Sequence, residues 1–309
     1  MILLADKDYI PKEKTVCALG LFDGVHQGHR LIINKAVAAA KEKGLKSAVF
    51  CFKTNTVTSK GENGKIEMLI SDEEKLEKIE ALGVDYIYSP DFAVFKGMTP
   101  EDFVEEILFK RLNCVCAVCG TDFTFGKFAQ GKASDLGRIG EAYGMDAVVM
   151  DKLAIDGEEV SSTAIREYIK SGEISSANKL LGYNFGFELT VCYGNQLGRT
   201  WNFPTINQEI PEDRILPKFG VYCSRVEIDG EKYYGVTNIG IKPTVEKNIK
   251  TPLAETYIID FDGDVYGKTV RTELYEFIRP ERKFESFDEL KAEIGKNICQ
   301  AKKYFERID

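Results

Sequence analysis

The sequence predicts an α/β chain of two domains: a parallel sheet covered by helices, and then a small antiparallel β-barrel that ends in a helix. Three observations support this. Apolar strand candidates alternate with helical patterns through the first part of the chain, the hydrophobic period becomes strictly alternating near residue 182, and the final segment returns to a helical stripe. We therefore expect domains at residues 1–181 and 182–309, and a length of 309 residues suits two domains.

Composition narrows the class of protein. The chain is 44% hydrophobic and 29% charged, which is ordinary for a globular enzyme. Its formal net charge of −8 argues against a general nucleic-acid surface. It contains no run of 18 apolar residues, and its first residues lack the basic start and apolar core of a signal peptide. We expect a cytoplasmic enzyme that binds neither nucleic acid nor membrane.

The first domain has clear element boundaries. Ser71 with Glu74 predicts a capping box, and Thr99 before Pro100 predicts another helix start. Apolar strands alternating with helices indicate a parallel sheet, which binds ligands at the carboxyl ends of its strands. The expected strands are Val16–Leu21, Ser47–Phe52, Tyr86–Tyr88, Val115–Gly120 and Ala147–Met150, and the expected helices are His29–Lys43, Asp72–Leu82, Pro100–Leu112 and Ser134–Tyr143.

In the second domain the apolar residues alternate. One strand is expected over residues 185–193, and a second over residues 221–228 with one slip in phase that suggests a bulge. Two Asp-Gly pairs, Asp229-Gly230 and Asp262-Gly263, predict type I′ hairpin turns between strands of a small barrel. A final helical stripe is expected to face the core and contains Phe287, Leu290, Ile294, Ile298, Ala301 and Phe305.

Cysteine spacing leaves two interpretations open. Cys114, Cys116 and Cys119 form C-x-C-x-x-C, which occurs in metal and redox sites. No second cysteine cluster exists, and the run lies inside an apolar segment. We favour a buried strand over a zinc or redox site.

Both histidines of the chain lie in the stretch GLFDGVHQGH, Gly20 to His29. A helix that begins near Gly28 would place His26 and His29 at its N-terminus, where open N–H groups and the helix dipole favour phosphate. Glycines 20, 24 and 28 let the backbone approach a ligand closely. Two histidines that merely decorate a loop are the alternative, but the whole pattern after a strand favours nucleotide chemistry.

Two further clusters in the first domain fit this chemistry. Ser161, Ser162 and Thr163 are typical of a helix N-terminus, with Arg166 one turn further on. Alone they describe an ordinary cap with a solvated arginine; beside the histidine loop they suggest the second half of a triphosphate site. In the segment GTDFTFGKFAQG, Asp122, Phe123 and Phe125 follow the end of a strand. An aromatic ring of a substrate could stack there, or the two phenylalanines could simply belong to the core.

The second domain has its own cluster, GNQLGRTWNFPTIN. Gly194 and Gly198, followed by Arg199, suit a loop that covers phosphates. Thr205 and Asn207 lie two residues apart, on one side of an extended segment, and their oxygens suit Mg²⁺. An ordinary barrel turn with capping hydroxyls is the alternative.

These motifs carry a family resemblance. The H-x-G-H and SSTAIRE stretches, in this order, resemble the H-x-G-H nucleotidylyltransferases, which have a Rossmann-like domain. The stretches FPTIN, GVTNIGIKPTV, AETYIIDFDGDVYG and FIRPERKF resemble the riboflavin kinase domain. Together they resemble the bacterial bifunctional riboflavin kinase/FMN adenylyltransferase (FAD synthetase) family over about residues 15–305.

The resemblance implies roles for particular residues. His26 and His29 would donate hydrogen bonds to the reacting phosphate of ATP, and Arg166 would neutralise charge on that phosphate or on pyrophosphate. Thr205 and Asn207 would hold Mg²⁺ with ATP, and Glu255 would be the general base, although in the sequence it is only a polar residue of a strand. Nucleotide contacts are expected from Gly20, Phe22, Asp23, Gly24, Gly28, Asp122, Phe123, Phe125, Ser161, Ser162, Thr163, Gly194, Gly198 and Arg199.

The implied function is FAD biosynthesis, with riboflavin, FMN, FAD and ATP as the small-molecule partners. One departure matters: family members commonly carry Pro-His-Pro after the second strand, whereas here Phe52 is followed by Lys53-Thr54-Asn55-Thr56. Two alternatives therefore remain. One is a riboflavin kinase whose first domain only binds nucleotide or FMN, or regulates; the other is a nucleotidylyltransferase for a different acceptor.

Overall fold

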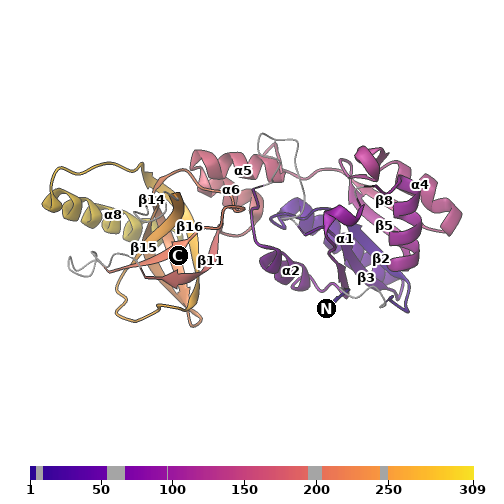
Figure 1. Ribbon diagram of the computed structural model, residues 1–309, viewed down its shortest axis with the longest axis horizontal. Helices are drawn as coiled ribbons and strands as arrows, with labels where there is room; N and C mark the ends of the chain where they lie inside the picture. Colours follow the sequence, from indigo (N-terminus) through magenta and orange to yellow (C-terminus); the bar gives the residue numbers. More distant parts are fainter. Residues whose placement is uncertain (5–9, 54–66, 96, 194–203, 244–249) are drawn as a thin grey trace. The chain divides into compact units, whose positions relative to one another are not determined.

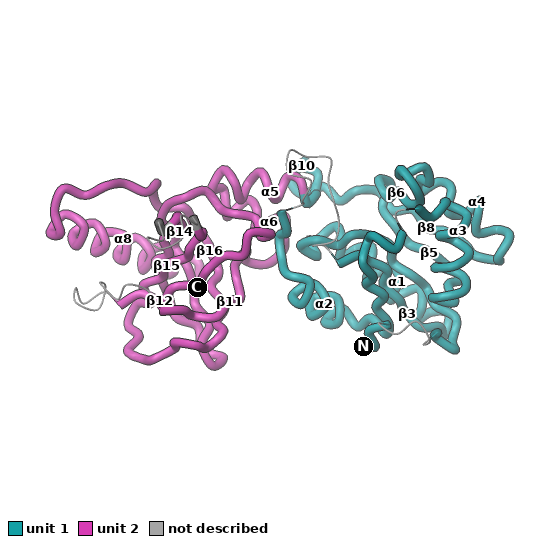
Figure 2. Tube along the Cα trace, viewed as in Figure 1, with its two compact units in different colours: residues 1–162 teal, residues 163–309 magenta. Residues whose placement is uncertain are grey.

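The computed structural model describes residues 1–4, 10–53, 67–95, 97–193, 204–243 and 250–309 (Figure 1). The chain forms two compact units, Met1–Ser162 and Thr163–Asp309, which are coloured separately in Figure 2. Within the described ranges, no helix combines the length and apolarity needed to span a membrane.

The first unit is built on a parallel sheet in the order β1-β4-β3-β2-β5-β8. Every residue of β2 is buried, as is expected of a strand covered on both faces. The chain adds strands on one side of β2 with β3 and β4, and on the other side with β5 and β8. The carboxyl ends of β2 and β5 therefore flank a topological switch point. The strands are β1 (Ile2–Leu3), β2 (Thr15–Leu19), β3 (Lys46–Phe50), β4 (Tyr86–Tyr88), β5 (Cys114–Gly120) and β8 (Asp146–Met150).

The helices of this unit follow the expected boundaries closely. Both predicted N-terminal boundaries are confirmed: Ser71 with Glu74, and Thr99 with Asp102, each form a capping box. The helix expected over Pro100–Leu112 is also confirmed, but most of it is wound as a π-helix, η3. The helices are α1 (Gln27–Glu42), α2 (Asp72–Glu80), η2 (Phe92–Phe95), α3 (Pro100–Asp102), η3 (Phe103–Arg111), α4 (Asp135–Gly140) and η5 (Glu141–Tyr143).

Short elements complete the first unit. A two-stranded ribbon follows β5, and another precedes the end of the unit. Buried side chains from β2, β3, β5 and η3 form one continuous core that includes Phe50, Phe103 and Leu108. The short elements are β6 (Thr124–Phe125), η4 (Lys127–Ala129), β7 (Gly131–Lys132), β9 (Ala154–Ile155) and β10 (Glu158–Glu159).

The second unit is a closed antiparallel barrel in the order β11-β12-β15-β14-β13-β16, with β16 pairing back to β11. Both parts of the predicted fold class, the parallel sheet and the barrel with a terminal helix, are confirmed. The elements are α5 (Ser162–Ser171), α6 (Ile174–Leu181), β11 (Gly186–Cys192), β12 (Thr205–Glu209), β13 (Gly220–Ile228), β14 (Glu231–Pro243), β15 (Lys250–Ile258), β16 (Thr269–Arg279) and α8 (Phe287–Ile308).

Helix α6 packs on the barrel, N-terminal to the expected boundary at residue 182. The Asn178 side chain donates to the Leu274 carbonyl of β16 at 3.0 Å and accepts from the Phe185 amide at 2.7 Å. Four residues of α6 are buried, Ile174, Ala177, Leu180 and Leu181. The barrel unit therefore includes helical residues that the change of hydrophobic period had assigned to the first domain.

One predicted hairpin turn is confirmed and the other is wrong. Asp229 and Gly230 both have positive φ and join β13 to β14 through a two-residue loop, because Ile228 pairs with Glu231. Asp262 and Gly263 do not have positive φ, and they lie in a longer connection between β15 and β16, which are not neighbours in the barrel. The predicted irregularity in β13 is confirmed by shifts in its pairing with β16.

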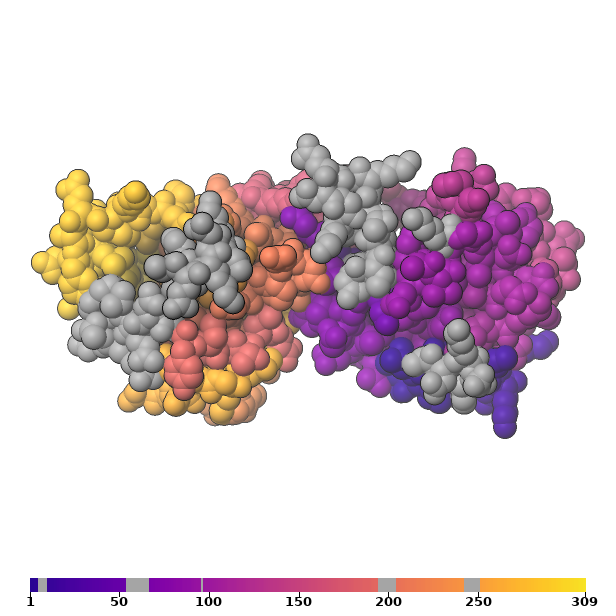
Figure 3. Space-filling view, in the orientation of Figure 1, coloured from indigo at the N-terminus to yellow at the C-terminus, as the bar shows by residue number. Residues whose placement is uncertain are grey.

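Helix α8 lies on the outside of the barrel unit, where much of it faces solvent (yellow in Figure 3). Ala301 and Phe305 are buried against barrel side chains such as Val236 and Tyr275, which confirms that half of the predicted stripe. The start of the stripe is less buried, since Phe287 is 42% exposed. The Arg225 guanidinium holds the C-terminal end of α8 on the barrel, because it lies over the Phe305 ring and pairs with the Asp309 carboxylate.

Candidate active sites

The first candidate site is the loop between β2 and α1, at the switch point of the sheet. Phe22, Gly24 and Val25 all have positive φ, and the Val25 amide closes a turn onto the Phe22 carbonyl at 3.1 Å. A β-branched residue in this backbone region is strained, and such strain is common at ligand sites. The loop thus holds a fixed, tight path from β2 into the helix.

The two histidines start α1 together. His26 is the N-cap residue, and its Nδ1 accepts a hydrogen bond from the His29 amide at 3.2 Å. The two imidazoles stack with centroids 3.5 Å apart and planes 19° apart, and the Phe22 ring meets His29 edge-on at 5.2 Å. Because Nδ1 of His26 is an acceptor, the neutral ring carries its proton on Nε2. The predicted placement of both histidines at a helix N-terminus is confirmed.

Gly28 leaves room for the His26 ring. A Cβ at this position would lie 3.3 Å from Nδ1 and Cε1 of His26, and 3.6 Å from the Val160 carbonyl oxygen. The contact with the ring is tighter than ordinary van der Waals distance. A glycine here therefore lets the His26 ring fold back over the first turn of the helix. At Gly20, a Cβ would lie 2.8 Å from the Phe22 ring.

Asp23 forms hydrogen bonds with two other segments of the first unit. Its buried carboxylate accepts from the Leu69 amide at 3.1 and 3.2 Å, and its carbonyl oxygen accepts from the Ser162 hydroxyl at 3.0 Å. These contacts tie the loop to the segment before α2 and to the first residue of α5. This structural role of Asp23 was not predicted from the sequence, because both contacts join segments that are distant along the chain.

The remaining predicted residues of the SSTAIRE stretch lie at the start of α5. Ser161 precedes the helix, Ser162 and Thr163 are its first two residues, and Arg166 lies about one turn in. Ser161, Ser162 and Arg166 are partly buried, whereas Thr163 is exposed. Arg166 and Thr163 belong to the second compact unit.

At the end of β5, the two phenylalanines differ in burial. Phe125 is in the core and packs against Phe103, with ring centroids 5.4 Å apart. Phe123 is partly buried and stacks on Phe125 with planes 17° apart. The Asp122 carboxylate is exposed and lies 3.5 Å from the Lys152 ammonium. Phe123 and Asp122 are therefore the more accessible members of this cluster.

The cysteine run is a strand, as predicted. Cys114, Cys116 and Cys119 are buried residues of β5. Burial, and the nearby Asp122 carboxylate, raise the pKa of the Cys119 thiol to about 12. This thiol is therefore protonated at neutral pH, which makes it a poor metal ligand or nucleophile.

Lys75 is a buried cation that the sequence did not single out. Its fully buried ammonium pairs with the Asp72 carboxylate at 2.7 Å and donates to the Phe52 carbonyl at 2.7 Å. It therefore holds the chain in place just after the carboxyl end of β3. Thr54, Asn55 and Thr56, which follow Lys53 where a Pro-His-Pro segment was expected from the family resemblance, lie outside the described residues.

The second candidate site lies on the barrel. Asn207 of β12 and Asn238 of β14 pair from either side with Glu255 of β15. Residues directly opposite one another share a face of the sheet, so these three side chains form a row across three strands. Thr205 pairs with Tyr257 on the same face, two residues from Asn207. Tertiary pairing thus brings together three predicted residues and adds Asn238.

Within this row, Asn207 has the character of a ligand to a hard cation. It is 4% exposed, and its buried Oδ1 has no hydrogen-bond partner within the described part of the chain. An amide oxygen beside a threonine hydroxyl and a carboxylate is the type of donor set that Mg²⁺ takes. The predicted phosphate loop of Gly194, Gly198 and Arg199 lies outside the described residues.

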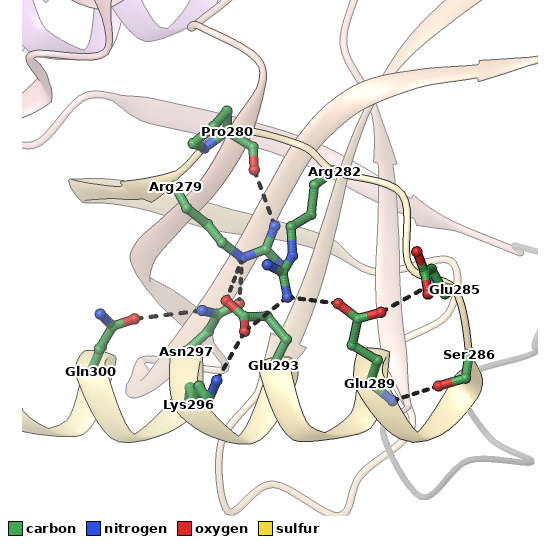
Figure 4. Close-up of polar contacts among 10 residues, drawn as sticks. All are labelled: Arg279, Pro280, Arg282, Glu285, Ser286, Glu289, Glu293, Lys296, Asn297 and Gln300. Carbon is green, nitrogen blue, oxygen red and sulfur yellow. Dashed lines mark hydrogen bonds and ion pairs between the residues drawn. The ribbon is translucent and has the colours of Figure 1, made fainter.

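A loop from β16 to α8 carries a network of charged side chains. The Arg279 guanidinium donates to Asn297 Oδ1 at 3.1 Å and lies 3.4 Å from the Glu293 carboxylate, and the Arg282 guanidinium bridges Glu289 and Glu293 (Figure 4). Burial lowers the pKa of Arg279, against the opposing effect of Glu293. This network fixes the loop against the first half of α8.

The fold defines a chain with an α/β unit built on a parallel sheet and a β-barrel unit, each with a candidate site. The family model for FAD synthetase matches residues 9–164, and that for riboflavin kinase matches residues 181–305. The bifunctional riboflavin kinase/FMN adenylyltransferase of Bacillus subtilis is 37% identical over 96% of this chain and 94% of its own length. The chain belongs to the family of bifunctional riboflavin kinase/FMN adenylyltransferases, which confirms the expected resemblance.

Other relatives agree over the same span. The enzymes of this name from Listeria monocytogenes and Escherichia coli K12 are 36% and 33% identical, over 95% and 96% of this chain and over 93% and 94% of their own lengths. A solved structure from Streptococcus pneumoniae, described as a macrolide-efflux protein, has a TM-score of 0.87 and 28% identity, and the match covers 97% of this chain and 98% of the other. That description concerns the streptococcal protein, and its likeness to this chain is one of fold.

Proposed function

We propose that the chain makes FMN and then FAD, by phosphorylating riboflavin with ATP and then transferring the adenylyl group of a second ATP to FMN. The observation that carries this proposal is the match, over nearly the whole chain, to curated relatives named for both activities. A family model for FAD synthetase on the first unit favours two activities over a kinase with a nucleotide-binding or regulatory module. The riboflavin kinase match argues against a different acceptor.

Adenylyl transfer would occur at the start of α1. An oxygen of the FMN phosphate bonds to the α-phosphorus of ATP while the bond to the bridging oxygen breaks, and pyrophosphate leaves. The Nε2–H of His26, His29 and the open N–H groups of α1 would donate to the oxygens that gain charge. Arg166 would neutralise the leaving pyrophosphate. The stacked histidine pair at a helix N-terminus supports this assignment.

Riboflavin phosphorylation would occur on the barrel. Glu255 would accept the proton of the ribityl hydroxyl as its oxygen bonds to the γ-phosphorus of ATP, and ADP leaves. Thr205 and Asn207 would hold Mg²⁺, which neutralises phosphate charge when bound. The buried Oδ1 of Asn207, directly opposite Glu255, supports this pairing of roles. The division of activities at residues 181/182 and the cytoplasmic location remain predictions.

Two variants of the purified chain separate the activities. With riboflavin, ATP and Mg²⁺, and with FMN and FAD resolved by chromatography over time, the wild-type chain should form FMN first and FAD later. His29→Ala should lower the rate of FAD formation by about a hundredfold or more and leave the rate of FMN formation largely intact. Glu255→Gln should slow FMN formation by about a hundredfold while FAD still forms from added FMN. Loss of both products in folded His29→Ala, or failure of folded Glu255→Gln to form FAD from added FMN, would contradict the assignment of separate sites.

A further inference from the structure

The row of polar side chains on the barrel contains a residue to which no role has been assigned. Asn238 lies directly opposite Glu255, across the pairing of β14 with β15, and therefore on the same face. Directly opposed residues have Cβ atoms about 4.5–5.5 Å apart, which is within reach of an amide and a carboxylate. Asn238 is partly buried, as is Glu255. The two side chains are therefore neighbours at the proposed site of phosphorylation.

A second carboxylate holds Asn238 from the other side. Nδ2 of Asn238 donates to Oε1 of Glu281 at 3.2 Å. A Cβ on Gly240 would lie only 2.3 Å from the same oxygen, so Glu281 rests directly on the backbone of β14. Asn238 and Gly240 are two residues apart and share this face. Glu281 is exposed, and the absence of a side chain at Gly240 leaves room for its carboxylate beside Asn238.

The segment that carries Glu281 is anchored on both sides. Arg279 and Arg282 flank it and are bound to Glu293 and its neighbours on α8 (Figure 4). The Phe284 ring lies 5.6 Å from the Arg279 guanidinium and 4.6 Å from that of Arg282. A carboxylate on so constrained a loop loses little conformational freedom when it fixes a neighbouring amide, which is the basis of preorganisation.

The chemistry of the amide suggests what this arrangement does. An ionised carboxylate only accepts hydrogen bonds, so the NH₂ group of Asn238 must face Glu281. That group carries two N–H bonds, and one is used by Glu281. The second is oriented by the first, on the strand directly opposite Glu255. Catalytic hydrogen bonds of this kind often tighten only in the substrate complex.

We infer that Asn238, held by Glu281, is a positioning residue for riboflavin phosphorylation: its amide orients the Glu255 carboxylate toward the hydroxyl of the substrate. This inference rests on the proposed function of Glu255 as the general base. It assigns Asn238 to the turnover step and not to the binding of ATP. It also gives the loop between β16 and α8 a role at the proposed site of phosphorylation.

The test uses the full chain with Asn238→Ala and Asn238→Asp, and measures kcat and KM for riboflavin phosphorylation. Both variants should lower kcat by about tenfold or more, because each removes the N–H donor, with KM for ATP unchanged within about twofold. Asp has nearly the shape of Asn, so a role in packing alone would leave Asn238→Asp active. Raising Mg²⁺ should relieve neither defect. Lys296→Ala, which removes an exposed ammonium from α8, should retain wild-type kcat as the control.

A double-mutant cycle identifies the group on which Asn238 acts. In a Glu255→Gln background, Asn238→Asp should lower kcat by less than about twofold more, because the carboxylate that it orients is gone. Glu281→Gln should reproduce part of the Asn238 defect. FAD formation from added FMN reports on the first unit and should stay normal, and thermal unfolding of each preparation reports on the fold of the barrel unit.

Each failure has a distinct meaning. Normal turnover in Glu255→Gln would overturn the proposed role of Glu255, and this inference with it. Slow turnover in Glu255→Gln with normal turnover in Asn238→Asp would overturn the positioning role alone. A full, multiplicative loss in the double variant would also overturn it, because Asn238 would then act independently of Glu255.

Discussion

Gly28→Ala tests whether the position of the stacked histidine pair matters for FAD formation. The change has two opposing effects on stability, crowding of the His26 ring and a higher helix propensity. The new Cβ would lie 3.3 Å from the His26 ring, so the imidazole must move by a few tenths of an ångström. Alanine is favoured over glycine by about 1 kcal/mol inside a helix, which offsets this crowding. We therefore expect the free energy of unfolding to change by no more than about 1 kcal/mol.

Activity should respond more strongly than stability. A misplacement of about 1 Å at a reacting centre can lower a rate by about a hundredfold, so a smaller shift of the stacked ring should still slow FAD formation by about tenfold. FMN formation from riboflavin should stay within about twofold of wild type, because this glycine lies in the other unit. The assay measures both products from one preparation, together with thermal unfolding.

The matched control is Gly137→Ala in α4, where a Cβ would meet only the Ala147 methyl at an ordinary 3.8 Å. It should keep both activities. Full FAD formation by Gly28→Ala would refute the reasoning that the ring position matters. Equal loss of FMN and FAD would point to a general effect on folding.

Three further predictions follow from the barrel and the sheet. Thr205→Val removes a proposed oxygen ligand, so its defect in FMN formation should be partly relieved by raising Mg²⁺; a defect that ignores Mg²⁺ would count against that role. A fragment beginning at Thr163 should fold and phosphorylate riboflavin, whereas one beginning at Gly182 should melt at a lower temperature, because it lacks the α6 contacts to β16; equal melting temperatures would contradict this. Burial would raise the pKa of Asp85, but hydrogen bonds from Lys46 and Ser47 outweigh it and hold the pKa below its ordinary 3.8. Asp85→Asn should therefore lower the melting temperature at neutral pH, and the gap to wild type should close as the pH falls below 3.8; a gap independent of pH would exclude this ionised pair as the cause.

Local signals in the sequence predicted most of the elements. The capping boxes at Ser71 and Thr99 fixed two helix starts, because a cap is satisfied within four residues of chain. Asp229-Gly230 fixed a hairpin for the same reason, since its turn needs only two residues of positive φ. The hairpin predicted at Asp262-Gly263 was wrong, because such a pair indicates a turn but does not determine which strands pair on either side of it.

The sequence by itself determined the fold class, the family and the start of α1 at the two histidines, because periodicity, caps and motifs are written along the chain. Only the tertiary structure decided which distant residues meet. The row of Asn207, Glu255 and Asn238 depends on the register of three strands, and a slip of one residue would have turned Glu255 to the opposite face. The contact of Glu281 with Asn238 joins residues 43 apart in sequence, and the burial of Lys75 depends on where β3 ends. Such contacts arise from packing between elements, which no local pattern encodes.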